Sequence, residues 1–195
     1  MCIRDSAEAF RWYKAAAESG SIDGLIGLAD CYKEGRGTEK DCEAAKALLL
    51  RAGSAGSGEA FKELGDLIHE ESHSSEDEKQ AHEAYQKAVK LGATDAYASL
   101  VIECFTKDFR RKQKDPVPLA LKYTADALKA DTDPTTLLMI SHLFTVIEDP
   151  RLMKPAADLA EKAAESGEAV AFYVLAAFYA NGVGVIGIRG RQPSS

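Results

Sequence analysis

The sequence predicts an all-α fold, an α-solenoid in which antiparallel helix pairs stack on one another. A short alanine-rich pattern recurs along the 195 residues, anchored at Gly20, Gly56, Gly92, Asp131 and Gly167. These anchors lie 36, 36, 39 and 36 residues apart, a period typical of stacked helical repeats. Apolar residues flank every anchor at helical spacing, and alanine, leucine, glutamate and lysine are abundant while β-branched residues are sparse.

The first helix of each pair is predicted to follow the anchor. Small residues stand four positions after it, and larger apolar residues stand eight and twelve positions after it. In chain order these three sets are Gly24, Ala60, Ala96, Thr135 and Ala171; Leu28, Leu64, Leu100, Met139 and Leu175; and Tyr32, Ile68, Cys104, Leu143 and Tyr179. Because steps of four residues return to the same side of an α-helix, we expect one buried stripe on each first helix.

The second helix is predicted to lie before the next anchor, with a stripe of its own. Its members are Ala9, Ala45, Ala81, Ala120 and Ala156; Trp12, Leu48, Ala84, Tyr123 and Leu159; and Ala16, Ala52, Ala88, Ala127 and Ala163. The two stripes together predict four complete helix pairs, at residues 22–54, 58–91, 94–130 and 134–166. A half repeat is predicted at each end, at residues 7–19 and 168–181.

Helix starts are predicted where an aspartate precedes the first turn, because its carboxylate can accept hydrogen bonds from free backbone N–H groups. These residues are Asp41, Asp115, Asp133 and Asp149, of which the last three precede a proline that needs no donor there. Ser75 and Glu78 have the spacing of a capping box. The glycine anchors are predicted to end helices in the left-handed conformation.

Three segments fall outside the repeat pattern. Residues 1–6, MCIRDS, are either a non-native leader resembling translated sequencing adapter or a real N-terminus. Residues 7–185 are predicted to form a single repeat array, and residues 186–195 an irregular tail. The three extra residues of the longest period fit into the basic loop 107–114, which is either a solvated loop or an anion contact.

From Ala7 to Val185 the chain resembles the Sel-one-like repeat family, a relative of the tetratricopeptide repeat. The most specific segments are WYKAAAESG at 12–20, LADCYKEGRG at 28–37 followed by Asp41, and LAAFYANGVGV at 175–185. The middle copies depart from the pattern, since Glu71 and His73 replace paired glycines. The resemblance implies a right-handed superhelix and a non-catalytic scaffold or adaptor for protein–protein interactions. Bacterial members of the family often meet host or envelope proteins.

The resemblance also implies a binding site for a protein or peptide on the concave face, which the first helices line. The implied contacts lie two residues before, and two and five after, the leucine of each first helix. They are Ile26, Asp30, Lys62, Asp66, Ile102, Phe105, Leu137, Ser141, Phe144 and Tyr173, and the same positions include Lys33, His69, Ala98, Ala177 and Ala180. An alternative is that Phe105 and Phe144 pack between neighbouring helices.

Composition argues against several other functions. The net charge of −7 argues against nucleic-acid binding, which needs basic patches. The four cysteines, Cys2, Cys31, Cys42 and Cys104, show no pairing pattern, which favours the cytoplasm over an oxidising compartment. Cys104 falls on the buried stripe and is predicted to be core. No small-molecule substrate or cofactor is evident.

Two motifs suggest other classes of protein. His69, Glu70 and His73 fit the H-E-x-x-H pattern, so a zinc-dependent hydrolase is the alternative to a scaffold. The repeat places His73 in a turn and no third ligand follows, so we predict no metal site and no catalytic residue. Residues 169–188 are uncharged and long enough for a membrane span, but their first half matches the repeat and glycines crowd their second half, so none is predicted. A regulatory segment of a larger protein is a further alternative.

Overall fold

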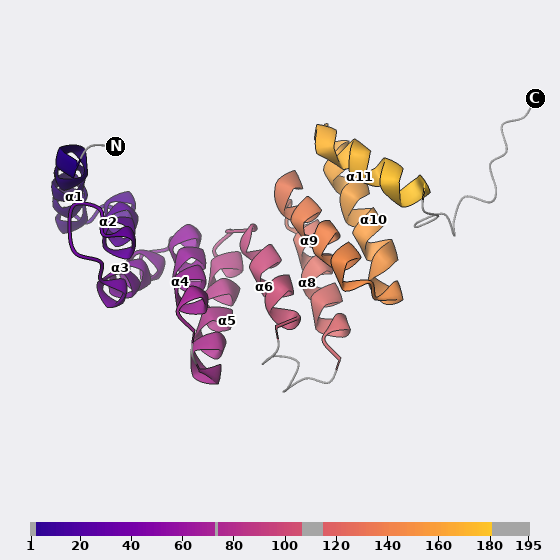
Figure 1. Cartoon of the computed structure of the whole chain (residues 1–195), viewed down its shortest axis with the longest axis horizontal. Helices are drawn as coiled ribbons and strands as arrows, with labels where there is room; N and C mark the ends of the chain where they lie inside the picture. Colours follow the sequence, from indigo (N-terminus) through magenta and orange to yellow (C-terminus); the bar gives the residue numbers. More distant parts are fainter. Residues whose placement is uncertain (1–2, 73, 107–114, 181–195) are drawn as a thin grey trace, which may run out of the picture. The chain divides into compact units, whose positions relative to one another are not determined.

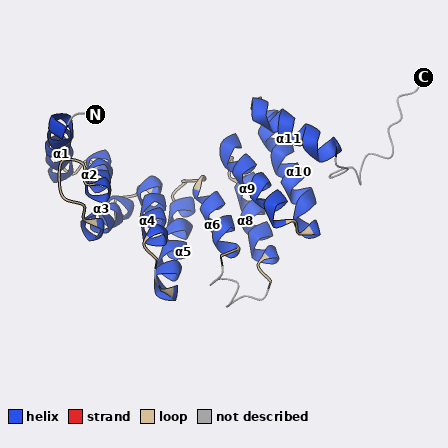
Figure 2. Cartoon of the chain, in the orientation of Figure 1, coloured by secondary structure: helices blue, strands red, loops and turns tan. Residues whose placement is uncertain are grey.

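The computed structural model describes residues 3–72, 74–106 and 115–180. Every regular element among these residues is an α-helix, as the prediction of an all-α fold requires (Figure 2). The chain divides into two compact units, residues 1–96 and residues 97–195, and each is described by itself. The predicted loop 107–114, the tail 186–195, Cys2 and His73 lie outside the described residues.

The first unit consists of successive helices that pack in chain order (Figure 1). They are α1 (Ile3–Glu18), α2 (Ile22–Glu34), α3 (Cys42–Ser54), α4 (Gly58–Glu70) and α5 (Ser75–Lys90). The pairs predicted at 22–54 and 58–91 are confirmed as α2 with α3 and α4 with α5. The first helix was predicted to begin at Ala7, but α1 begins at Ile3 and takes in four residues of the MCIRDS segment.

The second unit contains α8 (Val117–Lys129), α9 (Pro134–Ile147), α10 (Pro150–Glu165), α11 (Ala169–Ala180) and most of α6 (Ala96–Cys104) (Figure 1). Helix α10 contacts α8, α9 and α11. The Arg151 guanidinium at the start of α10 bonds Asp115, before α8, at 2.6 Å and Asp149 at 2.7 Å. These bonds tie the beginnings of two second helices together, and they lower the pKa of both carboxyls.

Small residues in the second helices let neighbouring helices approach closely. The alanines predicted for the stripes of α3, α5, α8 and α10 are buried in every case: Ala45, Ala52, Ala81, Ala84, Ala88, Ala120, Ala127, Ala156 and Ala163. Gly65 of α4 lies so close to Tyr85 of α5 that a Cβ atom there would be 2.6 Å from the ring. Close packing of small against large residues therefore holds α4 and α5 together.

Most of the predicted helix starts are confirmed. Asp41, Asp133 and Asp149 each accept a hydrogen bond from a first-turn N–H. Asp115 also accepts one, from Val117, but the N-cap of α8 is Pro116. The predicted capping box is wrong by one residue, since Ser74 and Asp77 exchange the reciprocal hydrogen bonds. Both Ser74 and Ser75 can cap a helix, so the motif alone does not choose between them.

The fourth repeat carries one more residue than the predicted alignment allows for. Gly20 and Gly56 are followed directly by the N-caps Ser21 and Ser57. Asp131 has the same left-handed conformation, with φ of 53°, but Thr132 separates it from the N-cap Asp133. The Thr132 hydroxyl donates to the carbonyl oxygen of Ala127 at 2.7 Å and is buried with it.

This extra residue changes which side of α9 faces the core. Thr136, Ile140 and Phe144 are buried, whereas the predicted stripe of Thr135, Met139 and Leu143 lies one residue away. Ile140 is 1% exposed and Met139 is 52% exposed. One residue turns an α-helix by about 100°, so the predicted buried face of α9 is wrong and its groove-facing positions move by one residue.

Candidate functional site

An apolar groove lies on the first helices of the second unit. It has a volume of about 630 Å³ and is lined by Ile102 of α6, by Thr135, Leu138, Met139, His142, Leu143 and Val146 of α9, by Val170 and Val174 of α11, and by Glu168. We refer to these residues as the apolar groove. The groove is where the family resemblance implies a binding face, because α6, α9 and α11 are the first helices of their pairs.

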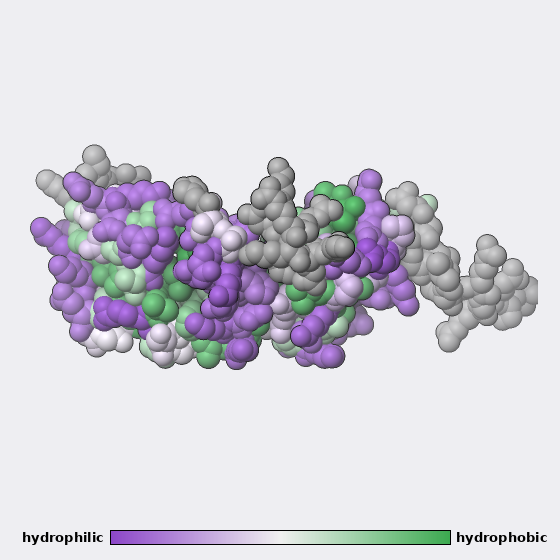
Figure 3. All heavy atoms as spheres, turned by 90° about the horizontal axis from the view of Figure 1, so that it is seen from below, coloured by the Kyte–Doolittle hydropathy of each residue, from purple (hydrophilic) through white to green (hydrophobic). Residues whose placement is uncertain are grey.

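Four hydrophobic side chains of the apolar groove are open to solvent. Ile102, Met139, Val146 and Val170 are 41%, 52%, 65% and 56% exposed. Figure 3 shows hydrophobic side chains, in green, at the surface of both units among hydrophilic ones. Exposed apolar side chains gathered in one depression are typical of a surface that binds another molecule.

A second depression continues the groove toward the ends of α9 and α11. It has a volume of about 420 Å³ and is lined by Thr145, Glu148, Met153, Tyr173, Val174, Ala177 and Phe178. Val174 belongs to both depressions. Thr135 and Glu168, near the starts of α9 and α11, line the first, and Thr145 and Ala177, near their ends, line the second. The two helices therefore run in the same direction, and the combined groove follows them.

Among the described residues that line the two depressions, the charged ones are both glutamates. In the described part of the second unit, every lysine and arginine lies on the second helices α8 and α10: Lys122, Lys129, Arg151, Lys154 and Lys162. Helices α6, α9 and α11 contain none. Glu168 lies at one end of the groove and Glu148 at the other, and neither forms an ion pair with a described residue.

Four of the nine contact residues predicted for this unit are buried. Leu137, Ser141 and Phe144 are buried, and the Ser141 hydroxyl donates to the carbonyl oxygen of Ala156 at 2.8 Å, so they are core residues and not a partner surface. The ring of Phe144 packs edge-on against that of Phe105, with the centroids 6.5 Å apart, as the packing alternative proposed. Ala98 is also buried.

The other predicted contacts in this unit reach the surface. Ile102 lines the apolar groove, and Tyr173, 79% exposed, lines its continuation. Phe105 is half-buried, and Ala177 and Ala180 are exposed. The residues missed on α9 are Leu138, His142 and Thr145, each one residue after a predicted contact. The sequence signal that could have located them is Asp133–Pro134, which fixes the start of α9 one residue later than the anchor spacing indicates.

The predicted contacts in the first unit are half-buried and mostly charged. Ile26 and Asp30 lie on α2, and Lys62 and Asp66 lie on α4. The charged groups hold one another in place. Asp30 bonds Arg36 at 3.1 Å, Lys62 bonds Asp66 at 3.0 Å and Asp95 at 3.6 Å, and the Tyr85 hydroxyl donates to Asp66 at 2.9 Å.

Two of these charged side chains also line a cavity of about 140 Å³, whose lining residues are Ala29, Asp30, Lys33, Leu49, Glu63 and Asp66. Burial, and then the neighbouring carboxylates Asp30 and Glu59, raise the pKa of Glu63 to about 7. The ammonium groups of Lys33 and Lys62 oppose this rise only in part. Glu63 is therefore a carboxyl group that releases its proton near neutral pH.

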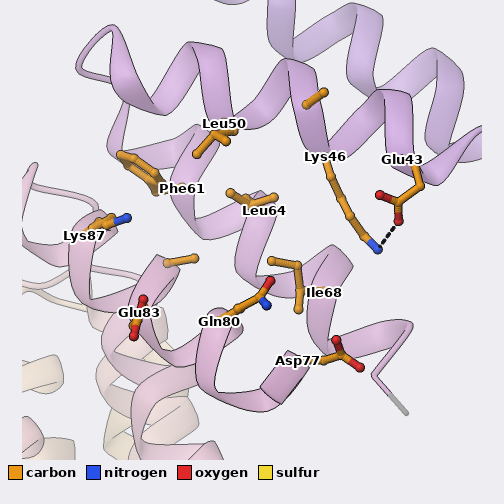
Figure 4. Close-up of a pocket in the computed structure, with 12 residues that line it drawn as sticks. Glu43, Lys46, Leu50, Phe61, Leu64, Ile68, Asp77, Gln80, Glu83 and Lys87 are labelled. Atoms are coloured by element: carbon orange, nitrogen blue, oxygen red, sulfur yellow. Dashed lines mark hydrogen bonds and ion pairs between the residues drawn. The ribbon is translucent and has the colours of Figure 1, made fainter. Parts of the chain in front are cut away.

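The other side of the first unit has a cleft of about 520 Å³ between α3 and α5, with α4 as its floor. In Figure 4, Leu50 of α3 and Phe61, Leu64 and Ile68 of α4 form its apolar part. Charged side chains line its edges, and Lys46 already bonds Glu43 at 2.8 Å and Glu71 at 3.0 Å. Lys87 lies over the Phe61 ring at 5.3 Å, so this cleft is more polar than the apolar groove.

The zinc pattern falls partly outside the described residues, because His73 does. His69 and Glu70 are exposed at the end of α4, and Glu70 lies 3.7 Å from Lys33. Among the described residues no three His, Cys, Asp or Glu side chains are grouped to hold a metal ion. Cys31, Cys42 and Cys104 are free thiols, and Cys104 is core as predicted, with burial raising its pKa to about 12.

The apolar segment 169–188 is described only in its first part, as the 12-residue helix α11. Of the helices in residues 3–72, 74–106 and 115–180, none combines the length and hydropathy that crossing a bilayer requires.

Comparison with known proteins finds a repeat family in the first part of the chain. The Sel1 repeat matches residues 1–21 and 22–57. These two matches lie within the first 57 of the 195 residues, which therefore carry the Sel1 repeat. Sel1 repeats generally form non-catalytic scaffolds for protein–protein interactions. No curated protein matches the sequence.

Two solved structures show that the Sel1-like fold extends over nearly the whole chain. A Sel1 repeat protein from Oxalobacter formigenes is 24% identical, with a TM-score of 0.66, and the match covers 96% of this chain and 74% of that one. The protective antigen c5321 of uropathogenic Escherichia coli strains, which displays an SLR fold, is 23% identical, with a TM-score of 0.66. That match covers 93% of this chain but only 38% of the antigen.

Proposed function

We propose that this chain is an interaction scaffold that binds an apolar segment of a partner protein in the apolar groove. One observation carries the proposal: first helices α6, α9 and α11 expose hydrophobic side chains together in one depression. Leaving such side chains in water costs about 25 cal/mol for each Å² of apolar surface. A partner that covers them recovers this free energy.

The proposed contacts combine two predicted residues with the corrected positions on α9. Ile102 and Tyr173 stay in the binding face, and Leu138, Met139, His142 and Val146 replace Leu137, Ser141 and Phe144. The contacts predicted at Ile26, Asp30, Lys62 and Asp66 stay predictions for the first unit, where the charged side chains are engaged in bonds among themselves.

Peptide-display panning against the full chain tests the proposal. We expect a shared apolar motif to be enriched on the parent chain and lost on Met139→Glu and Val146→Glu, which place a charge in the groove. Leu91→Glu is the matched control, because Leu91 is an exposed apolar residue of the first unit outside the groove. Circular dichroism checks that helicity is unchanged. Equal enrichment on the parent and both groove variants would refute the groove as the binding face.

A further inference from the structure

The chemistry of the apolar groove selects one kind of segment. Its lining is almost entirely hydrophobic, with Thr135 and His142 the polar side chains of α9 in it. An extended peptide would bring unpaired backbone N–H and C=O groups against this surface, and burying them without partners costs free energy. An α-helix satisfies these groups internally, so a helix with one apolar face suits the groove better.

The charges at the groove's ends add a second requirement. Glu168 lines the groove together with Thr135, which lies at the start of α9, and Glu148 follows the end of α9. Thirteen residues of helix separate Thr135 from Glu148, which at 1.5 Å per residue is about 20 Å. No described lysine or arginine on α6, α9 or α11 neutralises either carboxylate.

We infer that the partner segment is a cationic amphipathic helix, which lies along α9 and α11 with its apolar face in the groove. A lysine or arginine near each end of that face, about 13 residues apart, meets Glu168 and Glu148. This inference rests on the proposed function and adds the charge and conformation of the partner. A second copy of this chain is the competing occupant.

Two synthetic helical peptides of 18 residues test the inference. Both carry leucine along one face and glutamine on the other; one ends in lysine pairs and the other in glutamate pairs. Binding to the full chain is measured by fluorescence anisotropy. We expect the lysine peptide to bind at least roughly tenfold more tightly than the glutamate peptide at 50 mM salt, and the difference to shrink in 500 mM salt.

Substitutions in the chain test whether Glu148 and Glu168 are the carboxylates that attract the lysine peptide. Glu148→Gln and Glu168→Gln should each weaken binding of the lysine peptide by roughly twofold to fivefold, mainly through slower association. Asp158→Asn is the matched control, since it removes the same charge from an exposed site on α10. A weakening by Asp158→Asn as large as that at the groove would mean that net charge alone acts, which would overturn the inference.

The outcomes separate this inference from the proposed function. Equal binding of both peptides, abolished by Met139→Glu, would overturn the charge requirement and leave the groove intact. Failure of both peptides to bind would overturn the inference that the partner is a helix. The display experiment would then decide separately whether the groove is the binding face. A parent chain that runs as a dimer in size-exclusion chromatography, and as a monomer after Met139→Glu, would identify a second copy as the occupant and overturn the inference.

Discussion

The hydroxyl of Ser141 donates a hydrogen bond to the carbonyl oxygen of Ala156 at 2.8 Å, and this bond joins α9 to α10 inside the core of the second unit. Both residues are fully buried. The bond fixes one side of α9 against α10. Leu138 and His142, which follow the buried residues Leu137 and Ser141, therefore face the apolar groove.

Substitutions at Ser141 and its neighbour should therefore act on different properties. Ser141→Ala is expected to lower the free energy of unfolding by about 1 kcal/mol through the lost hydrogen bond. Ser141→Arg should lower it by several kcal/mol, because a guanidinium would enter a closed core. His142→Ala, on the exposed side, should change it by less than about 0.5 kcal/mol. Urea unfolding measures all three, and a stable Ser141→Arg protein would contradict the buried position of Ser141.

The N-cap Asp133 sets the start of α9 and is expected to matter for stability. The Asp133 carboxylate accepts two hydrogen bonds from Thr136, one from the backbone N–H at 2.9 Å and one from the side-chain hydroxyl at 2.5 Å. Asp133→Ala should lower the free energy of unfolding by about 1 kcal/mol, while Asp133→Ser, which keeps a cap, should recover most of the loss. Equal stability of the alanine and serine variants in urea would argue against a capping role.

Gly65 should resist replacement even though it lies within a helix. Alanine stabilises the helical state by about 1 kcal/mol relative to glycine. The new Cβ atom, however, would lie 2.6 Å from the Tyr85 ring. We expect Gly65→Ala to lower the free energy of unfolding by about 1–3 kcal/mol through overpacking. In the double variant with Tyr85→Leu the same substitution should cost less, because the ring is gone. A thermal or urea unfolding series of the four proteins gives the coupling, and simple additivity would count against the contact.

The raised pKa of Glu63 makes the stability of the first unit depend on pH. An acid whose pKa rises on folding, here from 4.5 to about 7, is protonated more in the folded state, so stability falls as pH rises through this window. Glu63→Gln removes the cost of ionisation, and because Glu63 is only partly buried we expect a gain of about 1–2 kcal/mol at pH 8.

At pH 4 the Glu63→Gln variant and the parent should be equally stable, because the carboxyl group is then protonated in both states. Glu18→Gln is the control, since Glu18 is exposed on α1 and is not among the groups that shift the pKa of Glu63. Urea unfolding at pH 4, 6 and 8 compares the three proteins. A constant difference between Glu63→Gln and the parent at all three values would contradict ionisation of Glu63 as the cause.

The helices themselves follow from local sequence. Asp41, Asp133 and Asp149 begin helices as expected, because a cap needs only the side chain and the backbone of the next few residues. The left-handed conformation of Gly20, Gly56, Gly92 and Gly167 could also be predicted from the sequence, since it depends on the backbone of a single residue. The alanine stripes of the second helices also needed no tertiary information, because their spacing alone selects one face.

The side of α9 that lines the apolar groove was predicted wrongly, because the repeat spacing was followed and not the helix start at Asp133–Pro134. Counting from Asp131 gave Leu137, Ser141 and Phe144, but the extra residue Thr132 moves every later position by one. Both Ser141 and His142 are plausible groove residues by type. Packing against α10 decides between them, since only the Ser141 side meets Ala156.

The sequence by itself determined that this protein is a series of paired helices with the Sel1-like pattern, because helix periodicity, caps and turns are local properties. The tertiary structure decided which side of α9 is buried, how Glu63 comes to lie between like charges, and that Glu148 and Glu168 stand at opposite ends of one apolar groove. These depend on contacts between residues distant in the chain, and a shift of one residue along a helix redirects a side chain by about 100°.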